Sequence, residues 1–162
     1  MGEREIVKYG QDVLRTRAEE VTDFDDTIRS LIEEMYRVME ENRGLGLAAP
    51  QIGVAKRVFV YDSEDGPHAL VNPRLISGRG EQASIEGCLS IPGLQGEVKR
   101  YETVTVEGLN EKGKKVRIRA TGLLARVFQH EMDHLDGTLF VDKADPDTIQ
   151  LISQEPEDIG ES

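Results

Sequence analysis

Residues 123–135 constrain the fold more than any other stretch, because a helical pattern there places ionisable side chains among apolar ones. At about 100° per residue, one arc of roughly 160° collects Leu123, Leu124, Val127, Phe128 and Leu135. The same arc also holds His130, Glu131 and His134. The opposite face, which is expected to meet solvent, holds Arg126, Gln129, Asp133 and Asp136. Burying a carboxylate and two imidazoles without partners is costly, so something must compensate them.

A metal ion is one form of compensation. His130 and His134 are four residues apart, so on a helix both imidazoles point the same way and can bind one ion. Glu131 is offset from that direction and can hold a water beside the ion. The alternative is a pair of core histidines satisfied by backbone carbonyls, with Glu131 at the rim. The position of all three on the apolar face favours the metal site.

A catalytic site of this kind needs a third protein ligand and leaves a fourth position open. Zinc peptidases with such a helix commonly take that ligand from downstream, where Glu155 is a candidate in an acidic segment beyond Pro146. Upstream, Cys88 is the one thiol of the chain. An unpaired cysteine is more often a core residue. Beside two histidines that need a third ligand, Cys88 is nevertheless the favoured candidate.

The other patterns indicate one α+β domain. A second helical pattern begins at Asp23–Asp26 and ends at Gly44. Strand-like runs at Arg57–Tyr61 and Ala69–Val71 flank a turn, and a hairpin is expected around Asn110–Gly113. We therefore predict antiparallel strands packed around a central C-terminal helix that carries the His130–His134 motif.

The balance of charge limits the class of partner. The chain has 20 basic and 31 acidic residues, a net charge of −11, which argues against direct binding to nucleic acid or to an anionic membrane. No apolar run approaches the ~20 residues of a spanning helix, and no signal-peptide pattern opens the chain. A single cysteine rules out an internal disulfide and suits a reducing cytosol, so a cytoplasmic location is expected.

The last stretch of the sequence differs in composition. Residues 143–162 are rich in acids, and Lys143 is their only basic residue. We expect residues 1–142 to form the catalytic domain and residues 143–162 to form a solvated acidic C-terminal tail.

Three short motifs together resemble those of the peptide deformylase family. They are GLGLAAPQ (Gly44–Gln51), EGCLS (Glu86–Ser90) and QHEMDHLDG (Gln129–Gly137), and they occur in the family's order. The likeness extends from about Ile6 to Asp142. It implies a bacterial-type hydrolase that removes the N-formyl group from the N-terminal methionine of newly synthesised polypeptides and releases formate.

The resemblance also implies a metal and its ligands. Cys88, His130 and His134 would hold one ion per chain, usually Fe²⁺, with Zn²⁺, Ni²⁺ or Co²⁺ as substitutes. Ligand softness alone would indicate zinc. A metal-bound hydroxide would attack the formyl carbon, with Glu131 as general acid and base.

The remaining roles follow from the same likeness. Gln51 and the Leu89 backbone N–H would stabilise the oxyanion, and the Gly46 backbone would orient the substrate. Gly44, Leu45, Leu123 and Val127 are the expected substrate-binding residues. Leu123 and Val127 lie beside His130 on the helical wheel, which supports their placement independently.

Two departures from the family pattern affect these expectations. Many members carry an Arg shortly after the cysteine motif that contacts the substrate backbone, and here Gln95 occupies that place. Some bacterial members dock on the ribosome through a basic C-terminal helix, whereas the tail of this chain is acidic. A transient ribosome contact is therefore expected only without such a helix.

Two other classes of function stay open at this point. One is a zinc peptidase that takes a downstream carboxylate as its third ligand. The other is non-enzymatic, either a structural metal module with four protein ligands or an inactive binder that uses the acidic tail. A purely structural site would have no need of Glu131 beside the metal.

Overall fold

The computed structural model describes residues 5–151, which form three α-helices and eight strands. The helices are α1 (Asp26–Glu41), α2 (Gly122–Leu135) and α3 (Phe140–Lys143), and short 3₁₀ turns cover Asp12–Arg15, Ala49–Ile52 and Pro146–Thr148. The strands are β1 (Gly46–Ala48), β2 (Val58–Ser63), β3 (Gly66–Arg79), β4 (Gln82–Cys88), β5 (Ile91–Arg100), β6 (Thr103–Leu109), β7 (Lys115–Thr121) and β8 (Gln150–Leu151).

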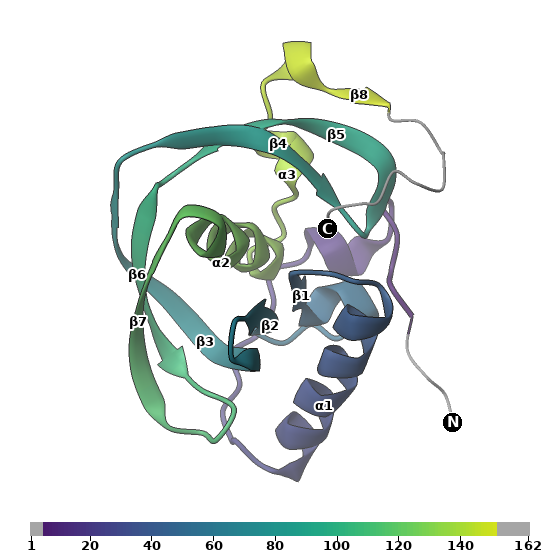
Figure 1. Cartoon of the computed structure of the whole chain (residues 1–162). Helices are drawn as coiled ribbons and strands as arrows, with labels where there is room; N and C mark the ends of the chain where they lie inside the picture. The colour runs from purple at the N-terminus through teal and green to yellow at the C-terminus, as the bar shows by residue number, and fades with distance from the viewer. Residues whose placement is uncertain (1–4, 152–162) are drawn as a thin grey trace.

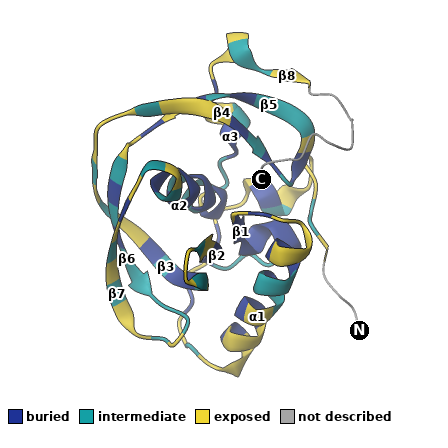
Figure 2. Ribbon diagram, viewed as in Figure 1, coloured by how far each residue is buried: buried dark blue, intermediate teal, exposed yellow. Residues whose placement is uncertain are grey.

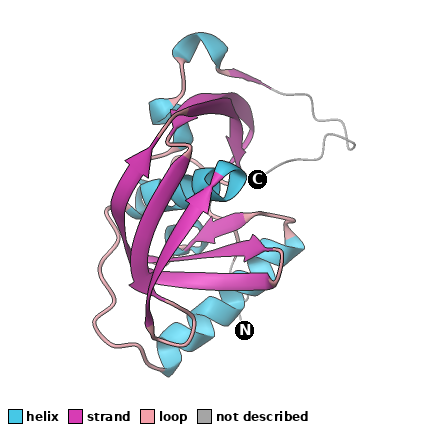
Figure 3. Cartoon of the chain, turned by 60° about the vertical axis from the view of Figure 1, so that its left-hand side comes forward, coloured by secondary structure: helices cyan, strands magenta, loops and turns pink. Residues whose placement is uncertain are grey.

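Two antiparallel sheets surround the helix α2. The larger sheet has the order β1-β2-β3-β6-β7, and the smaller one has the order β4-β5-β8. In Figure 1, α2 lies in the middle of the molecule, with β4 and β5 on one side and β6 and β7 on another. The turned view in Figure 3 shows the strands in front of this helix. The expectation of an α+β fold built around a central C-terminal helix is confirmed.

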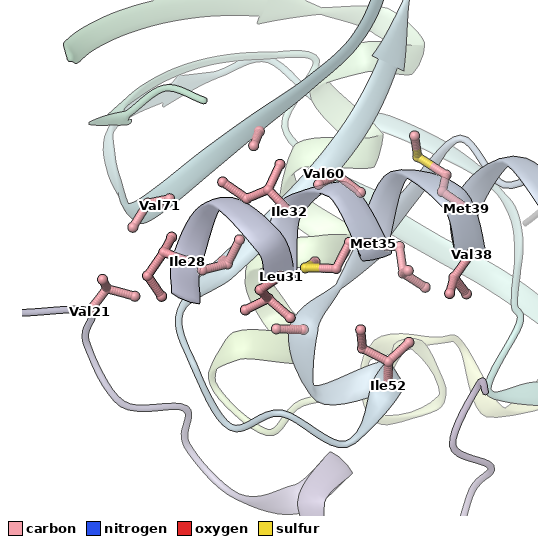
Figure 4. Packing of buried hydrophobic residues seen from close by; sticks show 14 residues of the cluster. Val21, Ile28, Leu31, Ile32, Met35, Val38, Met39, Ile52, Val60 and Val71 are labelled. Carbon is pink, nitrogen blue, oxygen red and sulfur yellow. The ribbon is translucent and has the colours of Figure 1, made fainter. Parts of the chain in front are cut away.

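The helix α1 closes one side of the larger sheet. The Asp25 carboxylate accepts hydrogen bonds from the backbone N–H groups of Thr27 and Ile28, so it caps the first turn. The apolar face of the helix, with Met35 fully buried at its centre, packs on β1 and β2 (Figure 4). The helix ends at Glu41, slightly before the expected stop at Gly44, because Arg43 takes the left-handed conformation with φ 55°.

A second core cluster holds α2 against the larger sheet. Phe128 of α2 is fully buried and packs edge-on against Phe59 and Tyr61 of β2, with ring centroids 5.6 and 4.8 Å away. Most of α2 is buried or half-buried (Figure 2). This packing fixes the position of α2 relative to the larger sheet.

Replacing Phe128 with alanine should destabilise the protein by about 3–5 kcal/mol, because the cavity lies between two layers that cannot collapse independently. The measurement is chemical denaturation of the metal-loaded protein. Leu123→Ala is the matched control on the same helix, since Leu123 is 61% exposed and should change the free energy of unfolding little. Equal losses for the two variants would contradict this account of the core.

Two features differ from the expectations. The long hairpin of β4 and β5 has no counterpart among the predicted strands. Arg126, expected on the solvent face of α2, is only 6% exposed.

The start of the expected tail packs on the domain. Ala144 is buried, and the backbone N–H of Asp145 donates to the carbonyl of Glu97 in β5. Residues 152–162 lie outside the described part of the chain, so the division at residue 142 stays a prediction. Among residues 5–151, no helix combines the length and the apolar character needed to cross a membrane.

Candidate metal centre and active site

The helix α2 carries three ionisable side chains into the interior. His130, Glu131 and His134 are 9%, 5% and 1% exposed. Burial lowers the pKa of His134 well below its usual value, so this imidazole is neutral, which is the form that binds a metal. The helical pattern of residues 123–135 thus produces a buried polar row, as its periodicity predicts.

Cys88 meets these histidines from the smaller sheet. It is the last residue of β4, where the chain turns sharply and Cys88 pairs with Ile91 of β5. Its Sγ lies 3.3 Å from Nε2 of His134, and the ligand atoms of Cys88, His130 and His134 all lie within 4.8 Å of one another. The structure therefore brings together the three predicted ligands.

A buried carboxylate orients the first histidine. Glu86, on β4, accepts a hydrogen bond from Nδ1 of His130 at 3.0 Å, which leaves Nε2 as the ring nitrogen available to a metal. Arg100 binds both carboxylate oxygens, at 2.7 and 2.9 Å, and Arg126 binds one of them. Burial alone would raise the pKa of Glu86, but the hydrogen bonds from Arg100 and His130 outweigh it and lower the pKa to about 2.

Glu131 lies in a different environment. Burial raises the pKa of its carboxyl to about 7, and its Oε1 has no hydrogen-bond partner among the described residues. A buried carboxylate with an unused oxygen and a pKa near neutrality can both take and release a proton there. It lies next to His130 on the helix that carries two of the candidate ligands.

Gln51 approaches the sulfur from the turn after β1. Its Oε1 accepts from the backbone N–H of Ala48 at 2.9 Å, so its Nε2 must point the other way. That Nε2 donates to Ser90 Oγ at 3.2 Å and lies 3.6 Å from Cys88 Sγ. Leu89 stands between Cys88 and Ser90 in the turn after β4. The expected oxyanion groups are therefore both near Cys88, Gln51 through its side chain and Leu89 as the next residue in the chain.

The expected substrate-binding residues lie partly inside and partly at the surface. Gly44 and Gly46 are buried, and Val127 is 8% exposed. Leu45 is 37% exposed and Leu123 is 61% exposed. Exposed leucines beside a buried polar site suit a surface that an apolar substrate side chain could cover.

The donor set fits a divalent metal ion. One thiol and two imidazoles are the ligand types of zinc and of other first-row ions, and a three-ligand set leaves room for a further group. The unpartnered Oε1 of Glu131 is the kind of acceptor that such a site needs beside it.

Comparison with known proteins agrees with this geometry. The model of the family "Polypeptide deformylase" matches residues 3–150. The chain belongs to the peptide deformylase family. The peptide deformylase of Carboxydothermus hydrogenoformans is 51% identical over 140 residues, which cover 86% of this chain and 92% of that protein. The family expected from the three motifs is thus confirmed, and deformylases are metal-dependent hydrolases that act on formyl-methionyl peptides.

Solved structures of the family share the fold. The peptide deformylase of Thermotoga maritima has a TM-score of 0.86 and 40% identity, covering 90% of this chain and 100% of that one. The enzyme from Legionella pneumophila has a TM-score of 0.85 and 43% identity, covering 90% and 88%. The arrangement of sheets around α2 is therefore the arrangement of the deformylase family.

Sequence reasoning missed the groups that support the candidate ligands. Glu86, Arg100, Arg126 and Ser90 received no role, although all four are buried. Spacing in the sequence could have revealed two of the four. Glu86 precedes Cys88 by two residues, the same-face interval of a strand, and Arg126 precedes His130 by four, the same-face interval of a helix. Glu155, the alternative downstream ligand, lies outside the described residues.

Gly46→Ala should lower the activity by about 100-fold, because small displacements of a catalytic group have effects of this size. A Cβ at this position would lie 2.8 Å from Glu131 Oε2 and 2.9 Å from Val127 Cγ1, so the carboxylate would have to move. The measurement compares the initial rates of Gly46→Ala and the wild type in samples that contain the same amount of metal per chain. Gly66→Ala in the β2–β3 turn is the control for backbone strain, since its Cβ meets nothing within 4 Å but its φ is 114°. It should lower stability and leave the rate unchanged, and an equally large loss of rate there would refute the steric argument.

Proposed function

We propose that this chain removes the N-formyl group from the N-terminal methionine of newly synthesised polypeptides and releases formate, with one divalent ion held by Cys88, His130 and His134. The observation that carries the proposal is the approach of a sulfur to two imidazoles from different elements, beside a buried carboxylate. When bound, the ion would supply a Lewis acid that lowers the pKa of water toward neutrality.

Glu131 is the proton carrier of the proposed reaction. Its carboxylate would accept a proton from the attacking water and return it to the amine that leaves. A pKa of about 7 suits both steps, because neither protonation state is strongly favoured near neutral pH. The burial that raises this pKa also keeps bulk water away from the carboxylate.

Gln51 and Leu89 would stabilise the charge that gathers on the formyl oxygen. The Gln51 amide is oriented in advance, since its Oε1 accepts a hydrogen bond from Ala48 N–H and its Nε2 donates one to Ser90 Oγ. Donors that need no reorganisation are the effective ones, and losing one typically costs about 10²–10³-fold in kcat. The Leu89 backbone N–H would act with it from the turn that follows Cys88.

The substrate would lie against β1 and the start of α2. The Gly46 backbone would orient the peptide, and Gly44 would bind the substrate beside it. Leu45, Leu123 and Val127 would form the walls of the slot for the methionine side chain. Gln95, where many members have an Arg, pairs with Gln150 of β8 in the structure. Its amide offers a neutral hydrogen-bonding group in place of a charged one.

The identity of the metal and the setting of the reaction are also part of the proposal. We propose Fe²⁺ as the natural ion, with Zn²⁺, Ni²⁺ or Co²⁺ as substitutes. A cytoplasmic location and a transient contact with the ribosome would follow from a substrate at the start of a new polypeptide.

The test is a formate-release assay on formyl-Met-Ala-Ser after anaerobic purification, together with elemental analysis. We expect turnover that depends on about one metal ion per chain, and no reaction with acetyl-Met-Ala-Ser as the matched control. Actinonin should inhibit, since the Synechococcus elongatus relative was solved in complex with it. Absence of formate release from a metal-loaded, folded sample would overturn the proposal.

A further inference from the structure

The candidate ligands come from two elements that must be held in register. Cys88 is at the end of β4, whereas His130 and His134 are on α2. Packing of α2 on the larger sheet does not by itself fix its distance from β4, because β4 belongs to the smaller sheet. Something must therefore join α2 to the β4–β5 hairpin.

Arg126 makes such a connection. Its side chain is 8% exposed and projects from α2 one turn before His130. Nε donates to Gln82 Oε1 at 3.3 Å, one terminal nitrogen binds Glu86, and the other donates to the Val98 carbonyl at 3.2 Å. Gln82 and Glu86 are on β4 and Val98 is on β5, so one guanidinium joins α2 to both strands of the hairpin.

Arg100 also binds the Glu86 carboxylate. It belongs to β5, binds Glu86 through two nitrogens, and donates to Asp133 of α2 at 2.9 Å. Together with Nδ1 of His130, the two arginines surround Glu86 with donors. A buried, fully bonded carboxylate of this kind has one permitted position, and moving it would leave a charge unpaired.

A buried guanidinium is not the most stabilising side chain that could fill this space. An apolar side chain of similar volume would avoid the cost of desolvation, and buried ion pairs often add little net stability. What arginine provides is a planar fork whose donors have fixed directions. Three acceptors on the hairpin can then locate α2 within the tolerance of hydrogen-bond lengths, which loose apolar packing does not achieve.

We propose that Arg126 is a positioning residue of the metal site, setting the distance between the sulfur on β4 and the imidazoles on α2. The contacts described for its guanidinium include none of the three candidate ligands, so it acts through Gln82, Glu86 and Val98. The inference rests on the metal site of the proposed function and extends it.

The test measures Co²⁺ binding to Arg126→Met by competition with a chelator, together with the visible spectrum of the Co²⁺-loaded protein. We expect binding weaker by about 10-fold or more, the usual effect of losing a group that supports a ligand. The ligand-field and thiolate charge-transfer bands should also shift, because they report the geometry of the ligands. Arg126→Lys, which keeps the charge and can reach fewer acceptors, should fall between Met and the wild type.

Arg57→Met is the matched control. Arg57 is another buried arginine, 7% exposed, and it holds the C-terminal end of the same helix by donating to the Leu135 carbonyl and to Asp136, both at 2.8 Å. It directly precedes β2, and its described hydrogen bonds go to Ala18, Leu135 and Asp136 rather than to the β4–β5 hairpin. We expect this variant to lose stability while it keeps the wild-type Co²⁺ affinity and spectrum.

The outcomes separate this inference from the proposed function. If the wild type binds no Co²⁺, the metal site fails and this inference fails with it. If the wild type binds Co²⁺ and Arg126→Met binds equally well with the same spectrum, only the role of Arg126 is overturned. Equal weakening in Arg57→Met would also overturn it, since general loosening of α2 would then suffice. Should Arg126→Met not fold, Arg126→Lys and Gln82→Ala provide the same comparison, with smaller shifts expected.

Discussion

Replacing Glu131 with glutamine is expected to abolish nearly all deformylation while the protein keeps its metal. The amide has the shape of the carboxylate but cannot accept the proton of the attacking water. Loss of general acid–base catalysis costs about 10²–10⁴-fold in rate. The metal content should not change, because the three candidate ligands are Cys88, His130 and His134. The measurement is kcat at saturating formyl-Met-Ala-Ser, with elemental analysis of the same sample.

The stability of this variant gives a second, independent readout. Burial raises the pKa of Glu131 to about 7, so the charged form is disfavoured in the metal-free protein. A neutral amide avoids that cost, and the metal-free variant should be at least as stable as the wild type at pH values above 7. Glu64→Gln, an exposed carboxylate in the β2–β3 turn, is the control for both measurements. Parent-rate turnover by Glu131→Gln would show that the proton carrier is misassigned.

The two main helices could be predicted from the sequence because their apolar residues recur with the helical period, as one face of each helix is buried. Met35 and Phe128 are core residues at positions that the pattern places on the buried face. The same reasoning placed His130, Glu131 and His134 in the interior. Periodicity is a property of each segment alone, so it is informative wherever one face of that segment is covered uniformly.

The β4–β5 hairpin could not be predicted in this way, because an apolar side chain is exposed there while a neighbouring charged one is buried. Ile85 is 51% exposed while the neighbouring Glu86 is 7% exposed, so polarity is misleading about which face is covered. Arg126 was misplaced because it falls just outside the apolar arc of the helical wheel, and an arc drawn from the apolar side chains leaves a polar residue at its edge to solvent. Both errors have one cause. Glu86 and Arg126 are buried because they pair with each other across two elements, and no local pattern contains that pairing.

Replacing Cys88 with alanine should remove metal binding, and with it the activity and the stabilisation that the metal provides. Two imidazoles remain, and they lack the anionic sulfur that completes the set. An ion that binds only the folded state at 100 times its Kd stabilises that state by about 2.7 kcal/mol. Thermal unfolding with and without added Co²⁺ measures this contribution directly. The melting temperature should rise with metal in the wild type and stay constant in Cys88→Ala.

The metal-free samples supply the control for packing. Cys88 is 7% exposed within a core cluster around β5 and α3, so losing its sulfur should cost about 1 kcal/mol even without metal. The metal-dependent difference is measured beyond that loss, which separates a ligand from a merely buried thiol. A peptidase that used a downstream carboxylate would retain its metal in Cys88→Ser and lose it on removal of residues 152–162. Unchanged metal content in both cysteine variants would therefore favour that alternative and would contradict a thiolate ligand at this site.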